Sequence, residues 1–318
     1  MLHELPLVIF TIIAQMSVGS FVVLGLIHLF GAHLFGAHLF GAKAGRDVID
    51  KVSDPALYAI GPILVLGLLA SMLHLGTPIR AINALRHLDS SWLSREILFG
   101  LLFAALGGAF ASCQWFKWLT PGLRQALAGL TALVGLGLVW SMANVYLLPT
   151  VPAWNSWATV VRFFATTFLL GSLAVGAVLV VTAEVRRRRG SALDEVSDRV
   201  IMSSLRGITI AAIAMLGVEF VVLPIYLGEL ATEGSAAATA SVGALVTTHG
   251  GYAVVQLVLV FLGVALLGVF LSRLVERPGS AVQGQLLAIV PVAAFVLVFA
   301  GEIIGRMLFY ASYVRAGL

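Results

Sequence analysis

The sequence contains few charged residues. Only 11% of its 318 residues are Asp, Glu, Lys or Arg, whereas 60% are hydrophobic, and its mean hydropathy is +1.04. A soluble domain of this composition would have too little charge to cover its surface, so we expect the lipid bilayer to be its solvent. The net charge of +4 therefore does not predict nucleic-acid binding, because basic residues in such a chain usually report membrane orientation.

Cysteine is almost absent as well. Cys113 is the single cysteine of the chain, and it lies in an apolar stretch. It has no second cysteine with which to form a disulfide or to share a metal cluster. If this protein handles electrons, we therefore expect the iron–sulfur clusters and other metal centres to be on another chain, and no metal site here.

Long uncharged runs recur along the whole sequence. About 20 helical residues cross roughly 30 Å of hydrocarbon, and only helices or closed barrels satisfy their backbone groups in lipid. The run that starts at Leu5 is longer than a signal-peptide core and has no Lys or Arg before it, so we expect it to be retained. We predict an all-α integral membrane protein, with residues 1–318 as one transmembrane domain. The eight predicted transmembrane helices cover about residues 5–28, 55–75, 96–116, 124–148, 160–183, 204–228, 250–272 and 285–312.

Basic residues are distributed unevenly among the predicted connections. Lys and Arg cluster after the first, third, fifth and seventh spans, whereas the N-terminus and the connections after the fourth and sixth spans have none. The positive-inside bias therefore predicts that both termini lie on the outer, periplasmic side of the cytoplasmic membrane. One connection contradicts this bias, because Arg80, Arg86 and Arg95 lie between the second and third spans, on the side where arginine is usually avoided.

Ionisable residues within the predicted spans gather towards the outer end. A charge near the bilayer centre costs about 3 kcal/mol on insertion scales, so such residues are functional candidates. A pathway across the whole membrane would need polar groups at every depth, and one polar pocket near the outer face fits the distribution better. The residues in question are His74, Glu96, Glu219, His249, Glu302 and Arg306.

Each of these residues also has a structural interpretation. Glu96 could stabilise the first turn of its helix, with Ser94 as the N-cap. Glu302 and Arg306 are four residues apart and could form a structural ion pair. His74 could bond a backbone carbonyl, and Glu219 could be a satisfied buried polar group. A b-type haem needs two facing axial ligands, and we expect none because the histidines at comparable depth lie at span ends.

Two further patterns have simple interpretations. The motif His-Leu-Phe-Gly-Ala occurs three times over residues 28–42, and a five-residue step turns a helix by about 140°, so the histidines share no face. We interpret it as a tandem duplication rather than a metal-binding tract. Aromatic residues at the predicted outer ends are typical of a belt at the lipid–water interface, and they are Trp92, Trp140, Tyr146, Trp154, Trp157, Tyr310 and Tyr313.

Several segments together carry a resemblance to a known family. They are residues 5–11 (LPLVIFT), 71–85 (SMLHLGTPIRAINAL), 93–97 (LSREI), 150–154 (TVPAW) and 301–306 (GEIIGR), the last followed by Phe309 and Tyr310. Over nearly its whole length the chain resembles the membrane-anchor subunit of dimethyl sulfoxide reductase and related anchors of molybdenum enzymes. The repeat at residues 28–42 and the four arginines at 186–189 depart from the family pattern, but both fall in connections away from the outer end.

The resemblance implies an anchor without haem that binds menaquinol near the outer face. Its electrons would pass to an iron–sulfur subunit, which supplies a molybdopterin catalytic subunit on the outer side. His74 and Glu96 match quinol-site residues of the family, so we expect them to be catalytic, with His74 taking a proton and Glu96 passing it outward. We expect the quinol to be bound by His74, Arg80, Glu96, Glu302 and Arg306, with Arg80 and Arg306 stabilising negative charge in the pocket.

Other interpretations remain open from the sequence. A quinone-linked anchor of the polysulfide reductase type would also have eight spans and would differ in its soluble partner. A proton or solute transporter would move its substrate without any partner. A purely mechanical anchor would bind no quinone.

Overall fold

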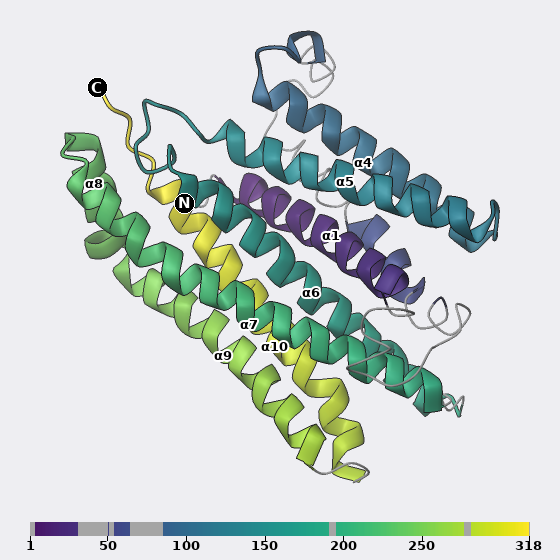
Figure 1. The fold of residues 1–318 in the computed structure, drawn as a ribbon. Coiled ribbons are helices and arrows are strands. Elements are labelled where there is room, and N and C mark those ends of the chain that lie inside the picture. Colours follow the sequence, from purple (N-terminus) through teal and green to yellow (C-terminus); the bar gives the residue numbers. More distant parts are fainter. Residues whose placement is uncertain are drawn as a thin grey trace.

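The structure is a computed structural model that describes residues 4–30, 50, 54–63, 85–190, 195–276 and 281–317. All regular elements in these ranges are helices (Figure 1). Residues 54–63 are also helical. The other elements are α1 (Leu5–Phe30), η3 (Leu85–His87), α4 (Trp92–Trp115), α5 (Pro121–Val145), α6 (Trp157–Arg188), α7 (Glu195–Thr232), α8 (Ala236–Gly243), η4 (Ala244–Thr248), α9 (Gly250–Glu276) and α10 (Ala281–Ala311).

Seven of the described helices are long and apolar enough to cross a membrane, which confirms an all-helical, multi-pass membrane protein. They are α1, α4, α5, α6, α7, α9 and α10, and each overlaps a span expected from the sequence. The remaining expected span, at about 55–75, is described only over its helical start at residues 54–63. His74 and Arg80 lie outside the described residues.

Polar N-caps set where several helices begin. Ser91 accepts a hydrogen bond from the backbone N–H of Ser94, so α4 begins four residues before the expected span. Thr120 caps α5 in the same way, with Pro121 in its first turn, and Ser156 caps α6. Such side chains satisfy the free N–H groups of a first turn, and they extend each helix beyond its apolar run.

The long helices form two groups that run side by side. The first helix group consists of α1, residues 54–63, α4 and α5, and the second consists of α6, α7, α9 and α10. α4 packs along α5, α9 along α10, and α6 against α7 and α10, while α1 and α6 join the groups along the middle of the bundle (Figure 1).

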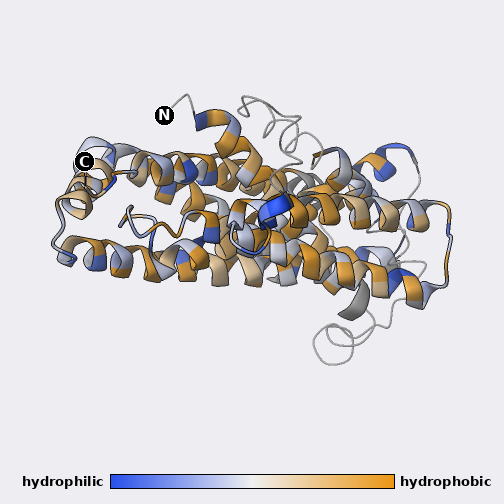
Figure 2. Cartoon of the chain, turned by 90° about the horizontal axis from the view of Figure 1, so that it is seen from above, coloured by the Kyte–Doolittle hydropathy of each residue, from blue (hydrophilic) through white to orange (hydrophobic). Residues whose placement is uncertain are grey.

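Apolar residues cover most of the outside of this bundle. Figure 2 shows orange, hydrophobic residues along the length of the helices, with hydrophilic residues more frequent at their ends and in the connections. Leu133, Ile210 and Val254 are each at least 60% exposed, although all three are aliphatic. A surface of this kind is favourable in contact with lipid tails and unfavourable in contact with water.

Small residues allow the two groups to approach closely at α1 and α6. A Cβ atom on Gly19 would overlap the backbone carbonyl of Thr167, and one on Gly171 would overlap the backbone of Gly19 and Ser20. Only glycine fits at such a backbone-to-backbone crossing, as is common between membrane helices. The junction of the two groups therefore depends on these two glycines.

A second close approach sets the direction of α10. Gly301 and Gly305 turn one face of α10 towards α9, where an added Cβ would lie 2.7 Å from Val260 Cγ2 and 2.5 Å from Gln256 Nε2 respectively. Glu302 and Arg306 each follow one of these glycines, so they lie further round the helix and face α6 and α1. The packing of α10 thus directs two ionisable side chains into the bundle.

Candidate functional site

The buried charges of the described residues gather at one end of the bundle. This polar end is where α1, α4, α6 and α9 begin and where α5, α7 and α10 end, at the left of Figure 1. Four charged side chains are buried in the described part of the chain, namely Glu96, Glu219, Glu302 and Arg306. Each lies in the half of its helix that is nearer the polar end.

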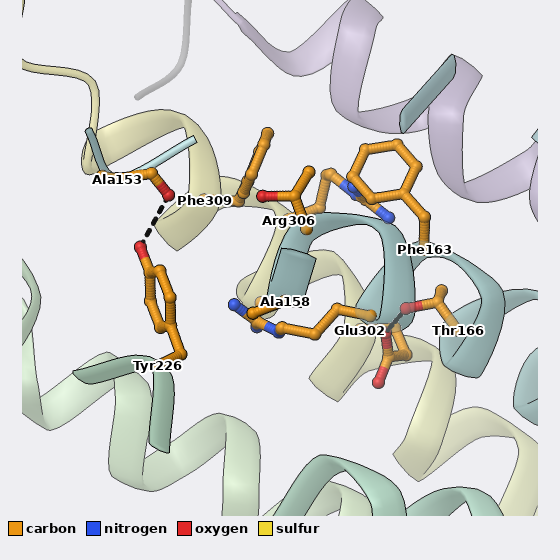
Figure 3. Close-up of a pocket in the computed structure, with 11 residues that line it drawn as sticks. Ala153, Ala158, Phe163, Thr166, Tyr226, Glu302, Arg306 and Phe309 are labelled. Carbon is orange, nitrogen blue, oxygen red and sulfur yellow. Dashed lines mark hydrogen bonds between the residues drawn. The ribbon is translucent and has the colours of Figure 1, made fainter. Parts of the chain in front are cut away.

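Glu302 lines a pocket between α6, α7 and α10 (Figure 3). Its Oε2 atom accepts a hydrogen bond of 2.7 Å from the hydroxyl of Thr166, while Oε1 is buried without a hydrogen-bond partner. Glu219 of α7 is also buried and interacts electrostatically with Glu302. Two carboxyl groups therefore lie together in the second helix group, within hydrogen-bond reach of each other when one is protonated, and Oε1 of Glu302 has no other partner among the described residues.

Arg306 lies in the same pocket but does not form the expected ion pair with Glu302. Its Nη2 atom donates a 2.6 Å hydrogen bond to Oε1 of Gln15 on α1, and its guanidinium carbon lies 3.8 Å from the ring centroid of Phe163. Gln15 in turn donates to the backbone carbonyl of Phe163 at 2.9 Å. Arg306 therefore connects α10 to α1 and α6, and its charge is held over an aromatic face.

Arg162 of α6 also lines the pocket and acts electrostatically on Glu219 and Arg306. From the sequence it was only an arginine near a span end, so its position in the pocket was missed. The signal available was its place five residues into α6, at the same depth as Arg306. The pocket is thus lined by two arginines and the carboxyl group of Glu302, while Glu219 acts on Glu302 from α7 without lining the pocket.

The interior of this pocket is narrow. Its empty space amounts to about 420 Å³ including the open mouth, but inside it admits water-sized molecules rather than a ring system. The hydroxyl of Tyr226 closes one side and is already bonded to the carbonyl oxygen of Ala153 at 2.8 Å (Figure 3). The pocket is therefore suited to water and protons, and a quinone ring would need a wider opening.

A buried aromatic cluster separates this pocket from Glu96. The hydroxyl groups of Tyr146 and Tyr310 are hydrogen-bonded at 2.7 Å, and Nε1 of Trp154 donates to the backbone carbonyl of Phe309 at 2.8 Å. Tyr146, Trp154 and Tyr310 are each less than 10% exposed. The expectation that they belong to an interfacial belt is therefore wrong, because they pack against one another instead of facing lipid.

The other aromatic residues of the expected belt lie differently. Trp140, Trp157 and Tyr313 are each nearly half exposed, as residues at a lipid–water interface are. Nε1 of Trp157 also bonds the carboxylate of Glu229 at 2.9 Å on the surface. The sequence pattern thus grouped exposed and buried aromatic residues together, because both kinds are Trp and Tyr near the ends of the helices.

Glu96 lies in the second turn of α4 and is 9% exposed. The interpretation of Glu96 as a first-turn residue capped by Ser94 is wrong, because the cap is Ser91 and the first turn contains no acidic residue. Glu96 acts electrostatically on both Tyr146 and Tyr310, as Arg306 does. The structure therefore links Glu96 to Arg306 only through the two tyrosines and does not place it in the pocket of Glu302.

The connection before α4 is held against the start of that helix. Arg95 donates hydrogen bonds to the carbonyl oxygens of Leu88 and Asp89 at 2.8 and 2.7 Å and stacks on the ring of Trp92. Arg86 and His87, in η3, are exposed. Arg95 thus has a clear structural role in the connection that breaks the positive-inside bias.

His249 lies at the start of α9, half buried beside the ring of Tyr252, and it lines neither the pocket of Glu302 nor the aromatic cluster. It follows η4, a π-helical turn that completes α8. Within the described ranges, no group of three or more His, Cys, Asp and Glu side chains is placed to hold a metal ion.

Comparisons with known proteins indicate one family. The family model described as "DMSO reductase anchor subunit (DmsC)" matches residues 1–312. The chain is 34% identical to a component of the anaerobic dimethyl sulfoxide reductase of Escherichia coli (strain K12), over 99% of this sequence and 97% of that protein. It is 32% identical to YnfH, an anaerobic dimethyl sulfoxide reductase component of the same organism, over the same shares. Over 27% of its length it is 39% identical to a component of the sulfite dehydrogenase of Allochromatium vinosum, covering 29% of that protein.

Proposed function

We propose a function for this chain on the basis of its family, since it belongs to the DMSO reductase anchor subunits (DmsC). It is accordingly a multi-pass membrane subunit of an oxidoreductase complex. Beyond this, we propose that it oxidises menaquinol and passes the electrons to a partner iron–sulfur subunit. That subunit would supply a molybdopterin catalytic subunit on the outer side of the cytoplasmic membrane.

The proposal places the quinol site at Glu96 in the first helix group, and it assigns His74 and Arg80 to the same site from the sequence alone. Glu96 is buried, has no hydrogen bond to any described residue, and directly follows the connection at residues 85–91. A buried carboxyl group without a partner is costly. A quinol hydroxyl would supply the missing hydrogen bond, and this is the observation that carries the proposal.

The chain itself offers no electron carrier in this proposal. Its single cysteine, Cys113, is near the far end of α4 from Glu96, and iron–sulfur clusters need several cysteine ligands. Electrons would therefore leave the quinol directly for the partner, which requires the quinol to lie near the surface where the partner docks. The polar end meets this requirement, because the buried charges converge there, and the positive-inside bias places it outside.

The proposed chemistry assigns a role to each predicted site residue. Oxidation of a quinol releases two electrons and two protons. His74 would accept the proton of one hydroxyl and Glu96 that of the other, or pass it outward, while Arg80 would stabilise negative charge on the ring oxygens. Glu302 and Arg306 would act from the second helix group, on protons rather than on the ring, because their pocket is narrow.

The test is quinol oxidation by the assembled complex with Glu96→Gln and His74→Ala. Each change should lower turnover about 100-fold or more, as loss of a general acid or base does, while the complex still assembles. Glu233→Gln is the matched control, because Glu233 is an exposed carboxylate near the polar end that bonds only Ser235 among the described residues. Normal turnover in both site variants would remove these residues from the mechanism. Loss of assembly would assign them a structural role instead.

A further inference from the structure

The pocket of Glu302 contains a feature that the quinol site does not use. Glu302 is only 4% exposed, and its Oε1 accepts no hydrogen bond from a described residue while both it and Glu219 are ionised, whereas a protonated Glu219 can donate to Glu302. Such an atom is costly unless water or a proton satisfies it. The pocket beside it has a mouth and an interior of water size. The geometry therefore prepares this carboxyl group to exchange a proton with water.

The charged groups around this carboxyl come from three helices. Glu219 faces it from α7, Arg162 from α6, and Arg306 from one turn further along α10. Two neighbouring carboxylates repel each other when both are ionised, whereas nearby arginines favour ionisation. Among the described residues, the other polar groups near this pocket are uncharged and include Gln15 on α1, Gln256 on α9 and the hydroxyl of Tyr226 on α7. Repulsion between the two carboxylates and attraction by the arginines oppose each other, so the carboxyl pair is suited to bind and release one proton.

A pair of hydroxyl groups joins the two helix groups at this depth. Tyr146 follows the end of α5 in the first group, and Tyr310 belongs to α10 in the second, with their oxygen atoms 2.7 Å apart and both rings buried. Glu96 acts on both tyrosines from one group and Arg306 from the other. A hydroxyl can accept one proton while it donates its own, so this pair can carry a proton between the groups.

We propose that Glu219 and Glu302 form a buried proton acceptor for quinol oxidation, reached through the hydroxyl pair of Tyr146 and Tyr310. The inference rests on the quinol oxidation proposed above. For each quinol, two electrons pass to the oxidised iron–sulfur subunit, and one of the two protons moves from Glu96 through water to Tyr146. Tyr146 releases its own proton to Tyr310, and Tyr310 releases its own to water. Water in the pocket carries the charge to the carboxyl pair and then to the aqueous phase at the mouth.

The first measurement is infrared difference spectroscopy of the assembled complex, oxidised against quinol-reduced. The wild-type complex should show a change in the carboxyl C=O stretching region. That change should be lost or reduced in Glu302→Gln and in Glu219→Gln, and also in Tyr310→Phe, which keeps both carboxyl groups but breaks the hydroxyl pair. The matched controls Glu233→Gln and Tyr252→Phe alter an exposed carboxylate and an exposed tyrosine of the same end, and both should keep the wild-type spectrum.

The second measurement is turnover in H2O and D2O across a range of pH. We expect Tyr310→Phe to lower turnover about tenfold, less than the loss of a direct acid or base, and to increase the solvent isotope effect. Binding of a quinol-analogue inhibitor should be unchanged in Tyr310→Phe and Glu302→Gln, which shows that the variants are folded and that the quinol site is intact.

The outcomes separate this inference from the function on which it rests. A wild-type complex that neither binds nor oxidises quinol would overturn both. If the wild type oxidises quinol and the carboxyl signal persists in both glutamine variants, the inference is wrong and the function stands. The same holds if Tyr310→Phe turns over with the rate and isotope effect of the wild type. Loss of inhibitor binding in Tyr310→Phe would make the tyrosine pair part of the quinol site, which also overturns the relay.

Discussion

At the polar end, the two helix groups contain different kinds of buried charge. The first group has one buried carboxyl group, Glu96, with no hydrogen bond to a described residue, next to the connection held by Arg95. The second has two buried carboxyl groups together with Arg306 and the half-buried Arg162. The first arrangement has a carboxyl group that lacks a donor among the described residues. The second is mostly satisfied within the chain and leaves one carboxylate oxygen for water.

This difference indicates that the two helix groups have different roles. A substrate site needs unsatisfied groups and space, whereas a proton site needs paired titratable groups and water. Tyr146 and Tyr310 lie at the boundary and bond to each other. The comparison can be tested by changes that break the contact between the groups, then by changes within the second group, and finally at the opposite end.

The largest effect is expected where the two groups meet. Gly19→Ala and Gly171→Ala each place a methyl group into the backbone of the facing helix. Overpacking costs about 1–3 kcal/mol when side chains can shift, and backbone cannot, so we expect a loss of more than about 3 kcal/mol and failure to assemble. Thermal unfolding and copurification of the partner subunits measure this.

The control for that change lies on the same helix. A Cβ atom on Gly25 would meet nothing within 4 Å, so Gly25→Ala should unfold at or above the wild-type temperature, because alanine also favours the helix. If Gly19→Ala were as stable as Gly25→Ala, the two groups would not be joined by this crossing.

The next effect concerns the arginines of the second group. Arg306→Met removes the donor to Gln15 and the charge over Phe163, so it should destabilise the protein by about 1.5–3 kcal/mol, as the loss of a buried hydrogen bond from a charged group does. Arg162→Met should cost far less, because Arg162 is half buried and no hydrogen bond of it is described. Thermal unfolding of the two variants compares them, and equal losses would contradict the structural role of Arg306.

A smaller effect is expected from two neighbouring threonines of α6. Thr166→Val removes the donor to Glu302 and leaves its second oxygen unpaired as well, which should cost about 1–3 kcal/mol. Thr167 bonds only the carbonyl of Phe163 one turn earlier, and that carbonyl keeps its helical partner, so Thr167→Val should cost less than about 1 kcal/mol. Chemical unfolding in detergent gives both values, and the reverse order would mean that Glu302 does not depend on Thr166.

The sequence predicted which segments form the helices more accurately than it predicted where those helices begin and end. Uncharged runs must cross the membrane as helices, so the seven described spans fall where the runs are. Their ends were less accurate, because caps such as Ser91 lie beyond the apolar run. The short α8 and η4 were missed, because residues 236–248 are too few to span a bilayer.

The sequence predicted near which end of the bundle the site residues lie, but it did not predict the direction in which their side chains point. The hydropathy pattern places Glu96, Glu302 and Arg306 near one end, but a helix that is apolar on all sides does not reveal which face is buried. For this reason Tyr146, Trp154 and Tyr310 were assigned to the surface, and Arg162 was overlooked. The ion pair expected from the spacing of Glu302 and Arg306 is absent, because Gln15 comes from a distant part of the sequence.

The smallest effect is expected at the opposite end, where both groups carry exposed ion pairs. Lys117, after α4, contacts Asp50 and Asp54 at 3.2 and 3.6 Å and so links two segments, whereas Arg188 and Glu184 pair within α6 alone. Lys117 is half exposed, so Lys117→Gln should cost at most about 1 kcal/mol, and salt should remove the difference from wild type. Unfolding temperatures at low and high salt measure this. A large loss that persists in high salt would show that Lys117 holds Asp50 and Asp54 through contacts that salt does not screen, like the part-buried bond of Gln114 to Asp54, and the contrast with the polar end would then disappear.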